Sequence, residues 1–177
     1  MKTITVPTYE QSSTANQALM DNLKNALTFV PNLYATFTYS DTALGTYLSL
    51  QNAKSSLSAK AREVINLAVS EVNTCRYCLA AHTMVGKMVG FTDAQILEIR
   101  AGTAGFDPRL DALARLVRNV AVNRGHTDKA VLQGFFDAGW NEGNLVDVMM
   151  VIGDKTISNY LHSTTEIPLD FPAAPAL

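Results

Sequence analysis

The sequence contains few cysteines and few charged residues, and each shortage excludes a class of protein. Its 177 residues include two cysteines, too few for a domain of this size held together by disulfide bonds. Charged residues make up 17% of the chain and hydrophobic residues 47%, a composition that excludes disorder over most of its length. The net charge of −2, without a cluster of lysine and arginine, predicts no nucleic-acid partner.

Long hydrophobic runs are also absent. No stretch of about 18 consecutive apolar residues could cross a membrane, and the first residues lack the apolar segment of a signal peptide. These absences predict a cytoplasmic protein without a membrane partner. The low content of charge also favours apolar surface that is buried against other subunits, so we expect a homo-oligomer.

Proline is scarce in the middle of the chain, where Pro108 stands alone between Pro31 and Pro168. Helix-start signals occur at four positions: Ser58, Thr92, Asp107 and Thr127. No segment alternates like a strand for long enough to compete. The pattern predicts helices at approximately 13–29, 32–39, 42–52, 58–72, 75–89, 93–101, 108–123, 128–138 and 142–163. We therefore expect an all-α protein, a compact single-domain helical bundle over 1–177, with extended arms at 1–11 and 167–177.

Both cysteines lie in one short string, Cys75-Arg76-Tyr77-Cys78, at the start of the predicted helix 75–89. Stepping about 100° per residue along this helix places Cys75, Cys78 and His82 on one face. The opposite face, with Tyr77, Met84 and Met88, is apolar too, so we expect both faces to be buried. Residues three and four apart on a helix are neighbours, which makes a reversible disulfide between the two thiols feasible.

Spacing alone leaves the chemistry of this helix open. A cap at Asn73 or Thr74 would activate Cys75 through the helix end, whereas His82 would activate Cys78. Inert buried cysteines are one alternative, and a structural zinc site is another, although it lacks a fourth ligand at standard spacing. Haem attachment is excluded because Leu79, not histidine, follows the second cysteine. We expect neither a metal nor a cofactor.

The segment from Glu63 to Gly102 resembles the AhpD-like alkylhydroperoxidases of the carboxymuconolactone decarboxylase family. In the family pattern a glutamate stands twelve residues before a Cys-x-x-Cys, and a histidine follows after three more residues. The matching positions are Glu63, Cys75, Cys78 and His82. The resemblance is dense over about 40 residues within the region 58–102, and the other predicted helices are compatible with it.

The resemblance implies a thiol-dependent peroxidase that reduces a small hydroperoxide. Cys78 would be the peroxidatic thiol and Cys75 the resolving thiol, and an external dithiol or redox protein would reduce the resulting disulfide. His82 would take the proton from Cys78, and Glu63 would lie behind His82 in a proton relay. Family members commonly assemble as trimers or hexamers. The wider family also implies an alternative, a cofactor-free decarboxylase or lyase, and a non-catalytic redox-sensing oligomer is a third hypothesis.

Three residues qualify this resemblance. Tyr77 stands where some family members carry a second histidine, and a tyrosine is a poor base at neutral pH. Tyr77 and His162 are possible auxiliary residues, although the position of His162 favours a role at the C-terminal end of its helix. Glu63 lies roughly opposite the predicted core stripe of the helix 58–72, so the local pattern alone predicts an exposed side chain.

Overall fold

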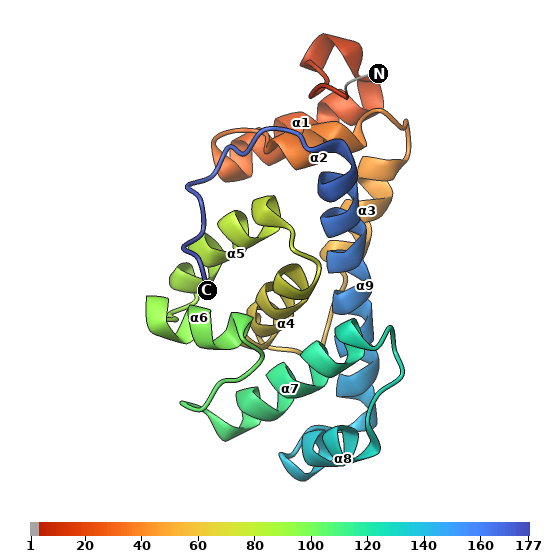
Figure 1. Cartoon of the computed structure of the whole chain (residues 1–177). Helices are drawn as coiled ribbons and strands as arrows, with labels where there is room; N and C mark the ends of the chain where they lie inside the picture. Colours follow the sequence, from red (N-terminus) through yellow and green to blue (C-terminus); the bar gives the residue numbers. More distant parts are fainter. Residues whose placement is uncertain (1–3) are drawn as a thin grey trace. The chain divides into compact units, whose positions relative to one another are not determined.

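The computed structural model describes residues 4–177, and over this range the protein has nine α-helices, one short 3-10 helix and no β-strand (Figure 1). The elements are η1 (Tyr9–Gln11), α1 (Thr14–Leu27), α2 (Asn32–Phe37), α3 (Ala43–Gln51), α4 (Ala59–Val72), α5 (Arg76–Met88), α6 (Asp93–Arg100), α7 (Pro108–Val122), α8 (Lys129–Asp137) and α9 (Glu142–Thr165). Each predicted helix is present, with its ends shifted by at most two residues. The all-α prediction is confirmed.

The chain forms two compact units, which are described separately. The first unit contains the chain up to Lys54 and the segment Leu161–Asp170, and the second contains Ser55–Tyr160 and Phe171–Leu177. In the first unit, the rings of Phe37 on α2 and Tyr47 on α3 stack with their centroids 4.5 Å apart. The backbone N–H of Asn32 donates to the Asp170 carboxylate at 2.6 Å, which fastens the segment after α9 to the start of α2.

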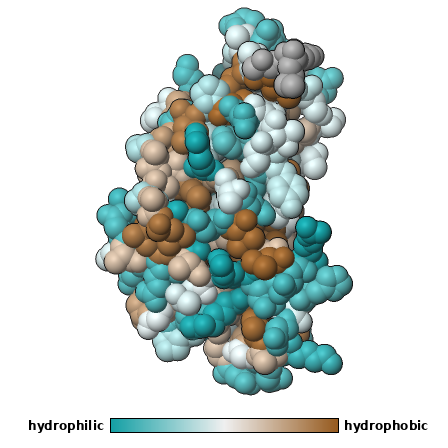
Figure 2. Space-filling model, viewed as in Figure 1, coloured by the Kyte–Doolittle hydropathy of each residue, from teal (hydrophilic) through white to brown (hydrophobic). Residues whose placement is uncertain are grey.

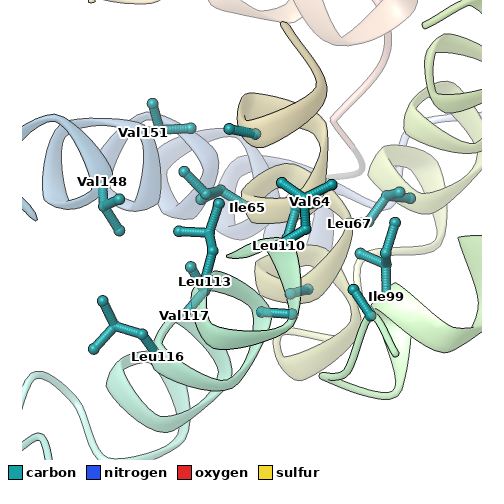
Figure 3. Close-up of a cluster of buried hydrophobic side chains, with 14 of the residues drawn as sticks. Val64, Ile65, Leu67, Ile99, Leu110, Leu113, Leu116, Val117, Val148 and Val151 are labelled. Atoms are coloured by element: carbon teal, nitrogen blue, oxygen red, sulfur yellow. The ribbon is translucent and has the colours of Figure 1, made fainter. Parts of the chain in front are cut away.

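The core of the second unit forms around α4, which packs against α5, α6 and α7. Helix α4 carries apolar side chains on several sides, and a helix with this pattern is buried. Figure 3 shows side chains of α4, α6, α7 and α9 converging on one cluster: Val64, Ile65, Leu67, Ile99, Leu110, Leu113, Leu116, Val117, Val148 and Val151. Because α4 is buried on most sides, three of its polar residues, Glu63, Asn66 and Ser70, are buried as well and require partners.

The helix starts follow local chemistry. Ser58, Thr92 and Asp107 cap α4, α6 and α7 as predicted, and Thr92 forms the predicted capping box with Gln95. The cap predicted at Thr127 is wrong, because the helix begins one residue later. The carboxylate of Asp128 accepts the backbone N–H of Ala130 at 2.7 Å instead.

The two predicted arms have different outcomes. Part of the first arm, 1–11, falls outside the described residues at 1–3, and Tyr9–Gln11 form a 3-10 helix rather than an extended chain. The second arm, 167–177, is free of helix as predicted. In the second unit it is held to the same chain, since the ring of Phe171 meets the ring of Tyr77 edge-on at 5.5 Å. A guanidinium N–H of Arg100 also donates to the carbonyl of Pro175 at 2.7 Å.

The surface contains both hydrophobic and hydrophilic residues. On the face seen in Figure 2, hydrophobic residues form small patches between hydrophilic ones. Within residues 4–177, none of the helices combines the length and the apolar character that a membrane span requires.

Candidate active site

The cysteines lie at a sharp turn between α4 and α5. Thr74 adopts a left-handed conformation with φ of 52°, which reverses the chain after α4. The predicted cap at Asn73 or Thr74 is wrong: Asn73 ends α4, and Cys75 itself is the N-cap of α5. The Sγ of Cys75 accepts the backbone N–H of Cys78 at 3.3 Å, and the backbone N–H of Cys75 donates to the Ser70 carbonyl at 3.0 Å. Cys78 therefore lies in the first turn of α5, at the positive end of the helix dipole.

The two thiols are free, buried and in direct contact. Cys75 donates a hydrogen bond to Cys78, and the two Sγ atoms lie 2.6 Å apart. A disulfide bond is about 2.05 Å long, so a small movement of either side chain brings the pair to bonding distance. In this hydrogen bond Cys75 is the donor and Cys78 is the acceptor.

The surroundings of the two thiols shift their pKa values in opposite directions. The hydrogen bond from Cys75, with smaller contributions from the charges of Lys155 and His82, lowers the pKa of Cys78 to about 6 against the opposing effect of burial. The hydrogen bond to Cys78 and burial both raise the pKa of Cys75. Near neutral pH the structure therefore holds Cys78 as a thiolate beside a protonated Cys75. This geometry distinguishes two thiols that the spacing alone left equivalent.

His82 lies one helical turn beyond Cys78 and is bonded to Glu63 on α4. Its ring Nδ1 is 2.8 Å from Oε2 of Glu63, and Nδ2 of Asn66 donates to the other carboxylate oxygen at 2.7 Å. Burial raises the pKa of Glu63, but the charge and hydrogen bond of His82 and the hydrogen bond of Asn66 outweigh it and lower the pKa. The arrangement keeps Glu63 ionised. Because Nδ1 of His82 is bonded to Glu63, Nε2 is the ring nitrogen that can exchange a proton with another group.

The exposure expected of Glu63 from its local pattern is wrong. Glu63 is 6% exposed, because α5 packs over the face of α4 that carries it. The buried second face expected of α5 is wrong in part as well. Tyr77 is buried, but Met84 and Met88 on the following turns are exposed. Burial on α5 is thus concentrated at its first turns, around the thiols.

Two residues that the sequence analysis missed also belong to this group, Lys155 and Asn159 on α9. Lys155 is 2% exposed and Asn159 is fully buried. Oδ1 of Asn159 accepts from Asn73 at 3.0 Å, and Nδ2 of Asn159 donates to the Ser70 hydroxyl at 3.2 Å. The available signal was a pair of polar residues one turn apart in a helix that is apolar over the preceding stretch.

Tyr77 and His162 were predicted as auxiliary residues, and a zinc site was an alternative to the thiol pair. Tyr77 is buried between the two cysteines in the chain, with its ring against Phe171. His162 is buried near the end of α9, in the first unit, and its auxiliary role stays a prediction. In the part of the chain that the structure describes, no group of three or more His, Cys, Asp or Glu side chains is arranged to hold a metal ion.

Part of the chain is similar to a known protein family. Residues 39–119 match the model of the carboxymuconolactone decarboxylase family, and this range includes Glu63, Cys75, Cys78 and His82. Over this range the chain is similar to the family, and its all-α fold is that of the AhpD-like proteins. No protein of curated function matches it significantly in sequence.

Solved structures extend the similarity to nearly the whole chain. An uncharacterized peroxidase-related protein with an AhpD core from Ralstonia eutropha JMP134 is 18% identical with a TM-score of 0.83, covering 93% of this chain and 90% of that one. A peroxidase-related protein from Silicibacter sp. TM1040 is 20% identical with a TM-score of 0.80, covering 95% and 89%. The debrominase Bmp8 is 13% identical with a TM-score of 0.74, covering 89% and 87%. At these identities the similarity establishes the shared fold.

Proposed function

We propose that the protein is a thiol-dependent peroxidase that reduces hydroperoxides through Cys78 and Cys75. The observation that carries the proposal is the polarity of the thiol pair. A buried Cys78 accepts a hydrogen bond from Cys75, and that bond is the main cause of a pKa lowered to about 6, so Cys78 is a nucleophile at neutral pH. The peroxidase-related proteins of the same fold are consistent with this activity.

The first step oxidises Cys78. Its thiolate attacks the terminal oxygen of the hydroperoxide, a new S–O bond forms and the O–O bond breaks. Cys78 becomes a sulfenic acid, and the departing alkoxide takes up a proton to become an alcohol. His82 is the group one turn away that can carry this proton, and its ion pair with Glu63 at 2.8 Å stabilises the protonated ring.

The second step forms the disulfide. The sulfur of Cys75 attacks the sulfur of the Cys78 sulfenic acid, and the hydroxyl leaves as water with the proton of Cys75. The contact of 2.6 Å between the Sγ atoms in the reduced protein makes this closure local. An external dithiol or redox protein then returns both cysteines to thiols. In the balanced cycle, one hydroperoxide and one dithiol give one alcohol, one water and one disulfide.

The test is the consumption of tert-butyl hydroperoxide with dithiothreitol as the reductant. We expect turnover by the wild-type protein, none by Cys78→Ser, and a single equivalent consumed by Cys75→Ser when no reductant is present. Full activity in Cys78→Ser would overturn the proposal. The need for a dithiol reductant fits a cytoplasmic location, where thiols are kept reduced.

The buried ion pair of His82 and Glu63 specifically supports a second candidate, a cofactor-free decarboxylase or lyase. Such an enzyme would work by acid and base catalysis and would keep its activity after alkylation of both thiols. A redox-sensing protein would instead lose two hydrogens with hydroperoxide but would not turn over with dithiothreitol. In the hydroperoxide assay, turnover with dithiothreitol identifies the peroxidase, and consumption of one equivalent without turnover identifies the redox-sensing protein. A decarboxylase or lyase does not turn over hydroperoxide at all.

A further inference from the structure

Helix α9 places an unusual set of polar residues inside the second unit. Four of its residues are almost completely buried: Asp154, Lys155, Ser158 and Asn159. Lysine is rarely buried without a partner, because moving an ammonium group out of water is costly. Lys155 and Asn159 are four residues apart and share one face of the helix.

The face meets the polar side of α4. Glu63, Asn66 and Ser70 follow one another at helical spacing on α4 and are all buried. Asn159 bonds to the Ser70 hydroxyl at 3.2 Å and to the Asn73 side chain at 3.0 Å. The carbonyl of Ser70 in turn accepts the backbone N–H of Cys75 at 3.0 Å. One short chain of hydrogen bonds thus connects α9 to the turn that holds the cysteines.

The positive charge of Lys155 acts on Cys78 and Glu63. Its ammonium lowers the pKa of both Cys78 and Glu63, and the Asn159 amide also lowers the pKa of Cys78. Glu63 is already bonded to His82 at 2.8 Å. The Lys155 ammonium is therefore placed to offset the negative charge that the pair of thiols carries.

We propose that Lys155 and Asn159 are positioning residues for the thiol pair. Asn159 fixes the turn at Cys75 against α9, and Lys155 supplies the positive charge that keeps Cys78 ionised. The proposal rests on the proposed peroxidase function, because it assigns two further residues to the same site. It explains why a lysine and an asparagine are buried in a helix that otherwise contributes apolar side chains such as Val148 and Val151 to the core.

The titratable groups that surround Cys78 come from several elements. Cys75 lies on the preceding turn, His82 on α5, Glu63 on α4 and Lys155 on α9. Helix α6, which also packs on α5, carries Arg100, and its Nε donates to the carboxylate of Glu71 on α4 at 2.7 Å. A test must therefore change the charge of Lys155 while leaving these other groups in place.

The experiment measures the rate of Cys78 alkylation by iodoacetamide against pH, with peptide mass spectrometry to assign the modified thiol. If Lys155→Met raises the pKa by one unit from about 6, the thiolate fraction at pH 6 falls about fivefold. Lys155→Arg keeps the charge and restores most of the rate. Lys129→Met, the same change at an exposed position of α8, is the matched control and leaves the profile unchanged.

A loss of folding must be distinguished from a change in the thiol chemistry. Circular dichroism selects folded variants, and Lys155→Gln replaces Lys155→Met if the latter does not fold. A folded variant without charge at position 155 and with the wild-type pH profile would overturn the role of Lys155. For Asn159, Asn159→Leu should slow formation of the Cys75–Cys78 disulfide by hydroperoxide, and an unchanged rate would overturn its role. Alkylation needs no hydroperoxide, so a shifted profile in a protein that does not turn over would refute the peroxidase proposal alone.

Discussion

Replacing Cys75 by alanine removes the hydrogen-bond donor that faces Cys78. That bond contributes most to the low pKa of Cys78, ahead of the charges of Lys155 and His82. With a pKa of about 6, Cys78 is roughly 90% thiolate at pH 7. Without the donor, the pKa moves toward the ordinary thiol value of about 8.5, at which only roughly 3% is thiolate.

The thiolate fraction expected for Cys75→Ala lies between these two values, because Lys155 and His82 remain. A rise to a pKa of about 8 would leave roughly a tenth of Cys78 as thiolate at pH 7, which is about a tenfold decrease. A more basic thiolate is also a better nucleophile, so the rate at one pH understates the shift. The assay is therefore the midpoint of the alkylation rate between pH 4 and pH 10.

Cys75→Ser is the matched control for this prediction, because its hydroxyl retains a donor at the same position. We expect its midpoint to lie between those of the wild-type protein and Cys75→Ala. A midpoint near 6 in folded Cys75→Ala would refute the inference that the neighbouring thiol activates Cys78.

The remaining predictions concern the relay, pH, the auxiliary tyrosine and assembly. Glu63→Gln should lower the free energy of unfolding by about 1–3 kcal/mol and slow turnover, measured by urea unfolding and the hydroperoxide assay; unchanged values in both would contradict the relay. The lowered pKa of Glu63 contributes stability above its unfolded value of about 4.5, and this should be lost as pH falls through the folded value; urea unfolding from pH 3 to pH 6 tests it. Tyr77→Phe keeps the ring against Phe171, so normal stability with slower turnover would assign a role to its hydroxyl, whereas normal turnover would exclude one. We expect a trimer or hexamer by light scattering, and a monomer would contradict this.

Much of the fold could be predicted because its signals are local. Ser58, Thr92 and Asp107 each bond backbone groups within the next turn of their own helices, so neighbouring residues suffice to identify the starts. At Thr127 the same logic failed by one residue, since two adjacent side chains could both cap and the carboxylate of Asp128 does so.

The site was predictable only where it lies on one helix. The common face of Cys78 and His82 follows from their spacing on α5. The burial of Glu63 depends on which side of α4 is covered by α5, and the local pattern of α4 does not contain that information. Lys155 is about 80 residues from Cys75 in the chain and reaches the group only through the packing of α9.

The central claim is that Cys78 is the residue that hydroperoxide oxidises. Its most direct test treats reduced Cys75→Ser protein with one equivalent of tert-butyl hydroperoxide in the presence of dimedone, which traps sulfenic acids, followed by peptide mass spectrometry. The account predicts a dimedone adduct on Cys78 together with one equivalent of tert-butanol. Consumption of the hydroperoxide without an adduct on Cys78, or no consumption at all, would contradict it.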